Sequence, residues 1–169
     1  MGSVSIIYGS TTGNTEEVAE LVARELNGSV QVIKDIAKAS AADFSAAEIL
    51  LLGTSTWDDG QLQQDWEYFF PQLDTIDLTG KKVALFGLGN AQGFSGQFVD
   101  ALGKLYHKIA ERGATICGFW PTDGYTYKSS GAVLNGHFCG LALDQENDRQ
   151  KTPQRVKAWV AQIRQEMNF

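Results

Sequence analysis

A run of hydroxyl-bearing residues lies between the first apolar segment of the chain and the first helical pattern, and it reads Ser10-Thr11-Thr12-Gly13-Asn14-Thr15. Backbone N–H groups at a helix start, the positive end of the helix dipole and neighbouring hydroxyls form a donor set that suits phosphate. The lysine with which a P-loop holds a triphosphate is missing. The run therefore predicts a site for one terminal phosphate monoester, with a hydroxyl-rich helix cap as the alternative.

A tryptophan stands in the polar segment after the third apolar segment, Thr54-Ser55-Thr56-Trp57-Asp58-Asp59-Gly60. We expect this segment to be a loop, where a large aromatic side chain is exposed unless something flat covers it. One interpretation is that Trp57 stacks on a planar aromatic ligand. The other is that the indole folds back onto the protein.

A third loop is expected after the fourth apolar segment, Gly87-Leu88-Gly89-Asn90-Ala91-Gln92-Gly93-Phe94. Its glycine spacing and its place in the chain differ from those of a dinucleotide fingerprint. Glycines here let the backbone turn tightly and approach a ligand edge, and Phe94 offers a second aromatic face. If the three loops meet at one edge, they predict a site for a mononucleotide with a large flat ring.

The elements that position these loops follow from the apolar pattern. Six apolar segments are expected to be strands: 4–8, 30–33, 49–53, 83–88, 115–119 and 138–143. Most are continuously apolar, which is typical of parallel strands buried on both faces. Helical stripes follow in 18–26, 98–109 and 156–167, and Thr152-Pro153 is expected to open the last helix. Two weaker helix signals flank the third strand. The pattern predicts a doubly wound α/β sheet, which binds ligands at the carboxyl ends of its strands.

The net charge of −6 arises from one segment. Residues 54–80 hold six acids and no lysine or arginine, whereas the rest of the chain is balanced. This segment is interpreted as a docking surface for a basic partner or as a solvated helix face. Nucleic acid and membrane insertion are not expected, because the charge is negative and the apolar runs are short. We expect residues 1–169 to form a single cytoplasmic domain.

Cys117 and Cys139 lie in apolar surroundings without a CxxC pattern, so we expect small, reduced core residues. No metal site is expected, since neither histidine has ligand-type neighbours at a suitable spacing.

These residues closely resemble the flavodoxin family. Besides 10–15, the matching segments are Thr56-Trp57 with Gly60, Asp65-Trp66-Glu67, Ala84-Leu85-Phe86-Gly87, Asp100-Ala101-Leu102-Gly103 and Phe138-Cys139-Gly140-Leu141-Ala142-Leu143-Asp144. The resemblance covers nearly the whole chain. It implies a flavodoxin-like five-stranded parallel sheet in the order 2-1-3-4-5, with helices on both faces. It also implies that an insertion at about 119–137, as in long-chain flavodoxins, splits the last strand.

The resemblance further implies non-covalent FMN and a low-potential, one-electron carrier rather than an enzyme. Residues 10–15 would hold the phosphate, and Trp57 and Phe94 would sandwich the isoalloxazine ring. The Asp58-Asp59 peptide would turn to bond flavin N5 and favour a neutral semiquinone, while nearby acids penalise the anionic hydroquinone. The cofactor-binding residues implied are Ser10, Thr11, Thr12, Gly13, Asn14, Thr15, Ser55, Thr56, Trp57, Asp58, Asp59, Gly60, Leu88, Gly89, Asn90, Phe94 and Gln97.

The chain departs from the family pattern at two positions beside the ring. Phe94 stands where related flavodoxins usually carry tyrosine, so the stacking face remains but the hydroxyl is lost. Asn90 stands in place of the usual aspartate and removes a negative charge. These departures bear on the tuning of the flavin rather than on the identity of the family.

The expected partners are redox proteins that dock on the acidic flavin edge of a monomer, such as a ferredoxin/flavodoxin-NADP reductase, photosystem I or nitrogenase. An FMN-dependent NAD(P)H:quinone reductase on the same fold is the main alternative. A phosphoacceptor receiver domain needs acids where this chain has Tyr8-Gly9 and Gly53-Thr54. A binding module with a degenerate FMN pocket is a further alternative, and anaerobic titration separates these classes.

Overall fold

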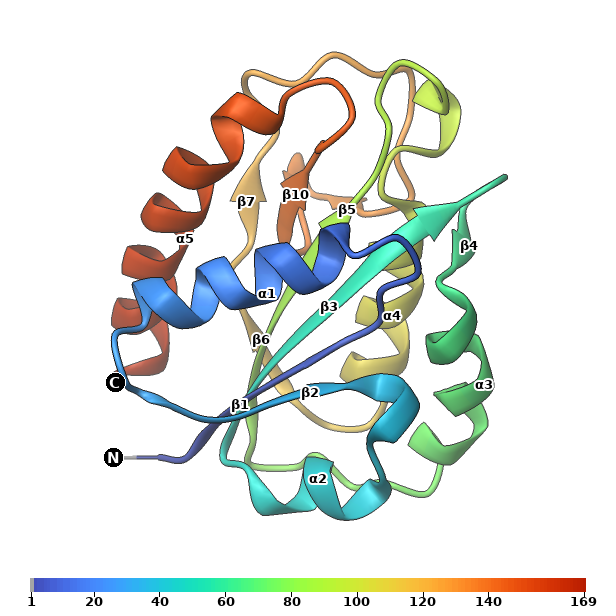
Figure 1. The fold of residues 1–169 in the computed structure, drawn as a ribbon. Helices are drawn as coiled ribbons and strands as arrows, with labels where there is room; N and C mark the ends of the chain where they lie inside the picture. The colour runs from blue at the N-terminus through green and yellow to red at the C-terminus, as the bar shows by residue number, and fades with distance from the viewer. Residues whose placement is uncertain (1) are drawn as a thin grey trace.

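The fold is built around one parallel sheet, which this computed structural model describes within residues 2–169 (Figure 1). Its strands are β1 (Val4–Tyr8), β2 (Val30–Asp35), β3 (Ile49–Trp57), β5 (Lys82–Leu88), β6 (Thr115–Cys117) and β10 (Leu141–Leu143). They lie in the order β2-β1-β3-β5, and both β6 and β10 pair in parallel with the outer side of β5. The predicted order is confirmed, and the fifth position is shared by two short strands.

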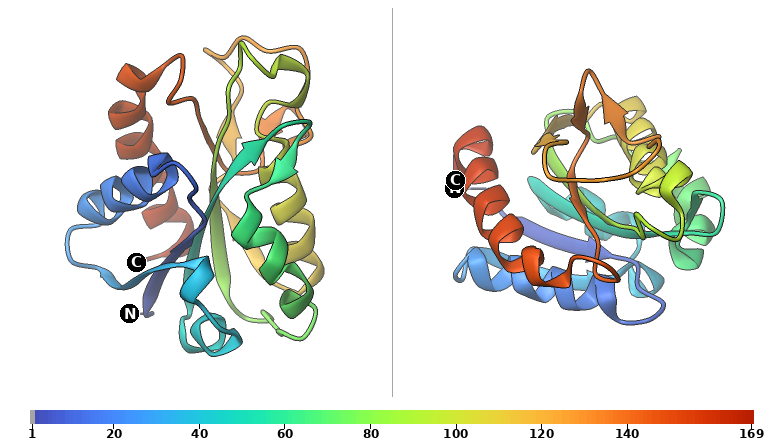
Figure 2. Two further views of the ribbon diagram at one scale, coloured as in Figure 1. Left: turned by 45° about the vertical axis from the view of Figure 1, so that its right-hand side comes forward. Right: turned by 90° about the horizontal axis from the view of Figure 1, so that it is seen from above.

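Helices cover both faces of the sheet (Figure 2). The helices are α1 (Asn14–Glu25), α2 (Ala41–Ala46), α3 (Gln64–Leu73), α4 (Asp100–Glu111) and α5 (Thr152–Met167). Helices α1 and α5 pack side by side on one face, and α2, α3 and α4 contribute to the core on the other. Both weak helix signals beside the third strand are therefore confirmed, as α2 and α3.

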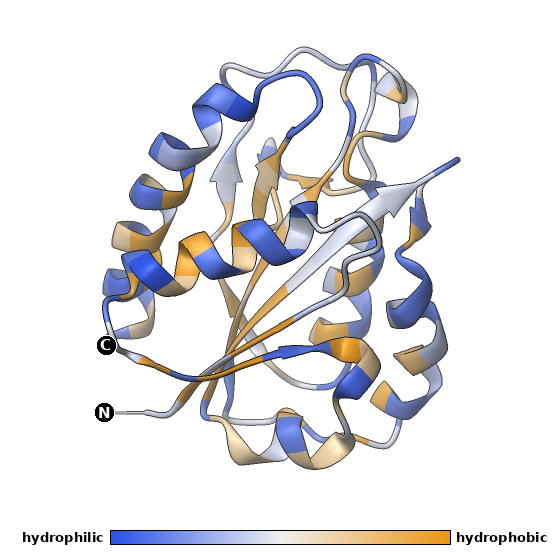
Figure 3. Ribbon diagram, viewed as in Figure 1, coloured by the Kyte–Doolittle hydropathy of each residue, from blue (hydrophilic) through white to orange (hydrophobic). Residues whose placement is uncertain are grey.

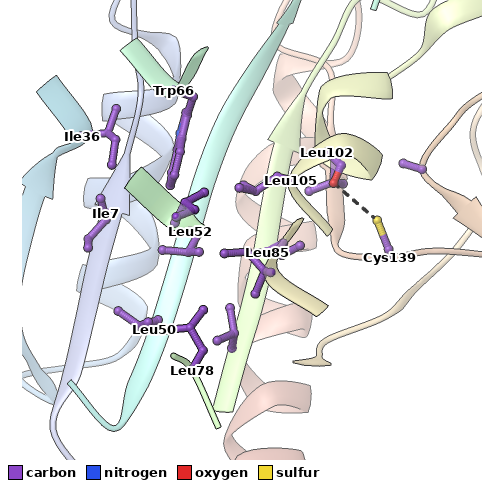
Figure 4. Close-up of a cluster of buried hydrophobic side chains, with 14 of the residues drawn as sticks. Ile7, Ile36, Leu50, Leu52, Trp66, Leu78, Leu85, Leu102, Leu105 and Cys139 are labelled. Atoms are coloured by element: carbon purple, nitrogen blue, oxygen red, sulfur yellow. Dashed lines mark hydrogen bonds between the residues drawn. The ribbon is translucent and has the colours of Figure 1, made fainter. Parts of the chain in front are cut away.

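Alternate residues of each central strand enter different cores, which explains why the strands are apolar along much of their length (Figure 3). Ile6 and Leu51 face α1 and α5, whereas their neighbours Ile7 and Leu52 face the other layer. Leu50, Leu52 and Leu85 belong to the same buried cluster as Trp66 of α3 and Leu105 of α4 (Figure 4). A strand buried on both faces gains apolar burial from every residue rather than from every second one.

The insertion between β6 and β10 forms a separate small antiparallel sheet in the order β7-β9-β8. Its strands are β7 (Trp120–Pro121), β8 (Val133–Leu134) and β9 (His137–Phe138). The prediction of an insertion that splits the last strand is confirmed. The boundaries differ, because β6 ends where Gly118 takes a φ of +81° and because Phe138 belongs to the inserted sheet rather than to the main one.

The prediction that residues 54–60 form a loop is wrong for residues 54–57. Strand β3 continues to Trp57 and pairs there in antiparallel fashion with β4 (Gln61–Leu62). Only residues 58–60 form the turn. The remaining short elements are the 3₁₀ helices η1 (Ile36–Lys38), η2 (Ser95–Gln97) and η3 (Arg149–Lys151).

Both cysteines are free thiols. Cys139 is buried, and its Sγ donates to the carbonyl oxygen of Leu102 at 3.7 Å (Figure 4). Burial raises the pKa of Cys139 to about 12. Cys117 is only half-buried, so the core prediction holds fully for Cys139 alone. Across residues 2–169, none of the helices combines the length and apolar character needed to cross a membrane.

Gly140 permits the close approach that starts β10. A Cβ on this residue would lie 2.3 Å from the carbonyl oxygen of Leu85, which belongs to the backbone of β5 and cannot move aside. We expect Gly140→Ala to lower the free energy of unfolding by about 2–3 kcal/mol, as overpacking does in tight cores. Urea unfolding of the apoprotein measures this, with Gly96→Ala as control because open space surrounds Gly96. Equal stabilities for the two variants would contradict the account.

Candidate functional site

A cavity of about 240 Å³ opens at the edge of the sheet where the carboxyl ends of β1, β3, β5 and β10 lie. Four chain segments at these strand ends form its wall. The lining residues are Thr12, Asn14, Thr15, Ser55, Thr56, Trp57, Asp58, Leu88, Gly89, Asn90, Phe94, Gln145 and Glu146. The three predicted loops therefore meet, as the parallel topology requires, and a fourth segment joins them.

The predicted phosphate loop divides into residues that line the cavity and residues that hold the loop. The lining residues are Thr12, Asn14 and Thr15. Ser10 is a holding residue, since its Oγ accepts from the N–H of Gly13 at 3.0 Å. Gly13 is the N-cap of α1, with a φ of +94°. The first N–H groups of a helix have no partner within it, so the start of α1 offers donors at the cavity wall.

Gln63 is a buried side chain that connects this loop to α3, and sequence reasoning missed it. Its Oε1 accepts from the N–H groups of Asp65 and Trp66 at 3.0 and 3.2 Å and so caps α3. Its Nε2 donates to Thr11 Oγ1 at 3.2 Å across 52 residues of sequence. Thr11 therefore holds the loop rather than lining the cavity. Glutamine is not a usual N-cap residue, so no local signal marks this role.

Charged side chains surround the start of α1. Arg149 Nη2 donates to Asn14 Oδ1 at 3.0 Å, and its Nη1 forms an ion pair with Glu17 at 3.0 Å. The hydroxyl of Tyr8 donates to Glu16 at 2.7 Å. Burial and this hydrogen bond raise the pKa of Tyr8 above its usual range. The arginine beside the phosphate loop is thus balanced by Glu17, and it lies 135 residues from Asn14 in sequence.

Trp57 stands at the tip of β3, where 36% of its surface is exposed. Its Nε1 donates to Ser55 Oγ at 2.9 Å, which fixes the indole beside the cavity. Thr56 Oγ1 accepts from the N–H of Ala101 at 3.1 Å and so ties the strand to the first turn of α4. Trp57 lines the cavity with part of its side chain exposed, as stacking on a flat ligand would require.

The turn after Trp57 requires left-handed backbone. Asp58 has a φ of +44° and lines the cavity, and Gly60 has a φ of +88°. A Cβ on Gly60 would lie 2.8 Å from Cβ of Asp100. Glycine adopts left-handed backbone freely, and aspartate adopts it more readily than most other residues, so Gly60 and Asp58 both suit this turn. Asp59 and Gly60 lie outside the cavity wall.

The loop after β5 supplies the opposite side of the cavity. Leu88, Gly89, Asn90 and Phe94 line it, and 42% of the Phe94 surface is exposed. Gln97 lies in η2 and does not line the cavity. Two aromatic rings therefore stand exposed at one cavity, one from each of two neighbouring strand ends.

The side chain of Asn90 points into its own loop. Its Oδ1 accepts from the N–H of Gly93 at 2.7 Å and from Nδ2 of Asn147 at 2.9 Å. The residue that replaces the usual aspartate thus keeps the acceptor role of a carboxylate without its charge.

Sequence reasoning also missed Gln145 and Glu146, which line the cavity directly after β10. The side chain of Gln145 is buried and accepts from Thr152 Oγ1 at the start of α5. The signal was present in the sequence, because these residues follow a strand just as the other three loops do.

The donor set fits a flavin mononucleotide. Hydroxyls and the start of α1 suit a single phosphate, and two exposed rings suit a flat aromatic group. Within residues 2–169, no lysine or arginine lines the cavity, whereas Asp58 and Glu146 do. Across residues 2–169, no group of three or more His, Cys, Asp or Glu side chains is arranged to hold a metal ion.

The doubly wound sheet and its cavity at the strand ends define a flavodoxin-like nucleotide-binding protein of the α/β class. The chain belongs to the flavodoxin family, whose model, described as Flavodoxin, matches residues 6–159. It is 48% identical to a flavodoxin of Synechocystis sp. over 165 residues, which are 97% of each chain. It is 46% identical to Flavodoxin 1 of Escherichia coli K12 over 170 residues, covering 100% of this chain and 97% of that protein.

Solved structures agree with this membership. The structure of Fusobacterium nucleatum flavodoxin bound to flavin mononucleotide superposes with a TM-score of 0.92 and 32% identity, covering 98% of this chain and 99% of that one. The chain is therefore an FMN-binding electron-transfer protein, and flavodoxins are carriers rather than enzymes. The quinone-reductase alternative is not favoured.

We expect Gln63→Ala to lower the free energy of unfolding by about 2 kcal/mol, because it removes the cap of α3 and the link to Thr11. Urea unfolding of the apoprotein measures this loss. Gln64→Ala is the matched control, since Gln64 is the exposed neighbour on the same helix, and it should change stability by less than about 0.5 kcal/mol. Similar losses in both variants would show that Gln63 does not link the two elements.

Proposed function

We propose that the cavity holds FMN with its phosphate at the start of α1 and its ring between Trp57 and Phe94. The observation that carries this proposal is that both exposed rings and the hydroxyl loop line one cavity. Thr12 and Thr15 would donate to the phosphate together with the first backbone N–H groups of α1. Ser10, Thr11 and Gly13 would act behind them by holding the loop.

The remaining predicted residues would surround the ring. The backbone of Leu88, Gly89 and Asn90 would meet one edge, with Gln97 close behind the loop. Asp58, Asp59 and Gly60 form the turn beside Trp57, in which Asp58 and Gly60 have a positive φ. FMN supplies the electron chemistry when bound, and these residues orient it and control the charge around it.

We also propose that redox partners dock on an acidic surface beside the cavity, formed by Asp58, Asp59 and Glu67. All three side chains are exposed, as is Tyr68 of α3 at 74%. Asp74, by contrast, pairs with Lys108 at 2.6 Å, and Asp77 lies before β5 at the other end of the sheet. A ferredoxin/flavodoxin-NADP reductase, photosystem I or nitrogenase would present a basic surface to this patch.

The protein would act as a cytoplasmic monomer, with residues 1–169 forming a single domain. Two cores that flank one sheet support the single domain. A low-potential carrier exchanges electrons with several partners in turn. In a monomer, the open edge of the cavity would stay accessible to each of them.

Changing Thr12 and Thr15 together to Ala should weaken FMN binding by about 1–3 kcal/mol, using about 0.5–1.5 kcal/mol for each hydrogen bond. Riboflavin lacks the phosphate, so its weaker affinity should not change. Fluorescence titration of the apoprotein with each flavin measures both effects, with Thr75→Ala as a control at an exposed site outside the cavity. Equal affinity of the native protein for FMN and riboflavin would contradict the phosphate assignment.

The pair of substitutions Asp59→Asn and Glu67→Gln should slow electron transfer from a ferredoxin/flavodoxin-NADP reductase at low ionic strength, by at least about twofold. The difference should shrink as salt rises, because exposed charges are screened beyond about 10 Å at 0.1 M. Stopped-flow kinetics across a salt series measures this, with Asp77→Asn as the matched control. Rates that respond neither to the pair nor to salt would make the acidic segment a solvated helix face.

A further inference from the structure

Asp144 is a buried carboxylate directly after β10, with 1% of its surface exposed. It accepts four hydrogen bonds, all from N–H groups. Within residues 2–169 it makes no ion pair, and the nearby Lys151 pairs with Asp148 at 3.8 Å. Burying a charge that only neutral donors balance costs free energy. The four hydrogen bonds to Asp144 are therefore expected to serve a structural or functional role.

Two of the bonds organise the segment that follows β10. Oδ1 of Asp144 accepts from the N–H groups of Glu146 and Asn147 at 3.1 and 2.9 Å. These bonds close a tight turn, as aspartate side chains often do. The turn presents Gln145 and Glu146 to the cavity.

The other two bonds hold the loop after β5. Oδ2 of Asp144 accepts from the N–H of Ala91 at 3.0 Å and from Nδ2 of Asn147 at 2.8 Å. The same Nδ2 donates to Asn90 Oδ1 at 2.9 Å. One residue earlier, the carbonyl oxygen of Leu143 accepts from the N–H of Gly89 at 3.0 Å. The backbone that would meet the ring edge is thus fixed from behind by Asp144.

We infer that Asp144 is a positioning residue for the flavin: through Ala91, Asn147 and Asn90 it fixes the ring-edge loop, and it places a carboxylate behind that loop. This inference rests on the proposed function, in which the cavity holds FMN. Asp144 does not line the cavity, so it acts through the residues it bonds.

Asparagine at position 144 would keep the shape but not the bonds. Its amide has one acceptor oxygen, so its NH₂ group would face two N–H donors on one side of the side chain. The bonds to either the ring-edge loop or the turn would be lost, together with the negative charge.

The test compares Asp144→Asn and Asn147→Ala with Asp77→Asn as control. Asp77 also accepts a backbone N–H, from Thr79 at 2.9 Å, but at the far end of the sheet. Each apoprotein is titrated with FMN and with riboflavin, and both one-electron potentials of each FMN-loaded protein are measured.

We expect Asp144→Asn to weaken the binding of FMN and of riboflavin by the same factor, about tenfold. The reason is that the ring-edge loop would contact the isoalloxazine ring, which both flavins share. The lower of the two one-electron potentials should rise, because the substitution removes a negative charge near the reduced ring. Asn147→Ala should weaken the binding of both flavins equally, and it should shift the lower one-electron potential less than Asp144→Asn does. Asp77→Asn should change neither property.

Unchanged potentials together with unchanged riboflavin affinity in Asp144→Asn would overturn the inference and leave Asp144 with a structural role only. Weakening confined to FMN would also overturn it, because the effect would then act through the phosphate. If Asp144→Asn does not fold, Asn147→Ala decides by the same flavin comparison. If the native protein binds neither flavin, the proposed function fails instead.

Discussion

The parallel pairing of β1 and β5 with β3 is the constraint on which the rest of the molecule depends. The register sets Ile6 beside Leu51 and Leu51 beside Ala84, so these strands run in the same direction and end at the same edge. The chain passes from β1 outward to β2 and then across to β3, and strand order therefore reverses between β1 and β3. The loops that leave this point cannot cover one another, which leaves the cavity open between them.

Charge is distributed around this cavity according to what each part of FMN carries. In the proposed binding mode, hydroxyls and the first N–H groups of α1 would meet the phosphate, and the nearby cation Arg149 is paired with Glu17. Asp58 and Glu146 would lie near the ring, and within residues 2–169 no lysine or arginine lines the cavity. This arrangement would bind a dianionic phosphate without attracting a second anion, and it would disfavour negative charge on the ring. That combination suits a low-potential carrier.

Much of this could be predicted from the sequence because it rests on local patterns. The continuous apolar strands, the stripes of α1 and α5 and the hydroxyl loop each lie within a short window. The rest depends on contacts between distant residues. Gln63 caps α3 and donates to Thr11 in the loop after β1. The residues next to Gln63 in the sequence indicate neither role. The extension of β3 to Trp57 depends on pairing with β4, whereas the polar composition of this segment by itself indicates a loop.

Anaerobic reductive titration of the FMN-loaded protein tests the central claim most directly, namely that this cavity makes a one-electron carrier from a two-electron cofactor. We expect one FMN per chain, two separate one-electron steps, and no oxidation of NADPH unless a reductase is added. A single two-electron step, or oxidation of NADPH by the chain alone, would contradict it.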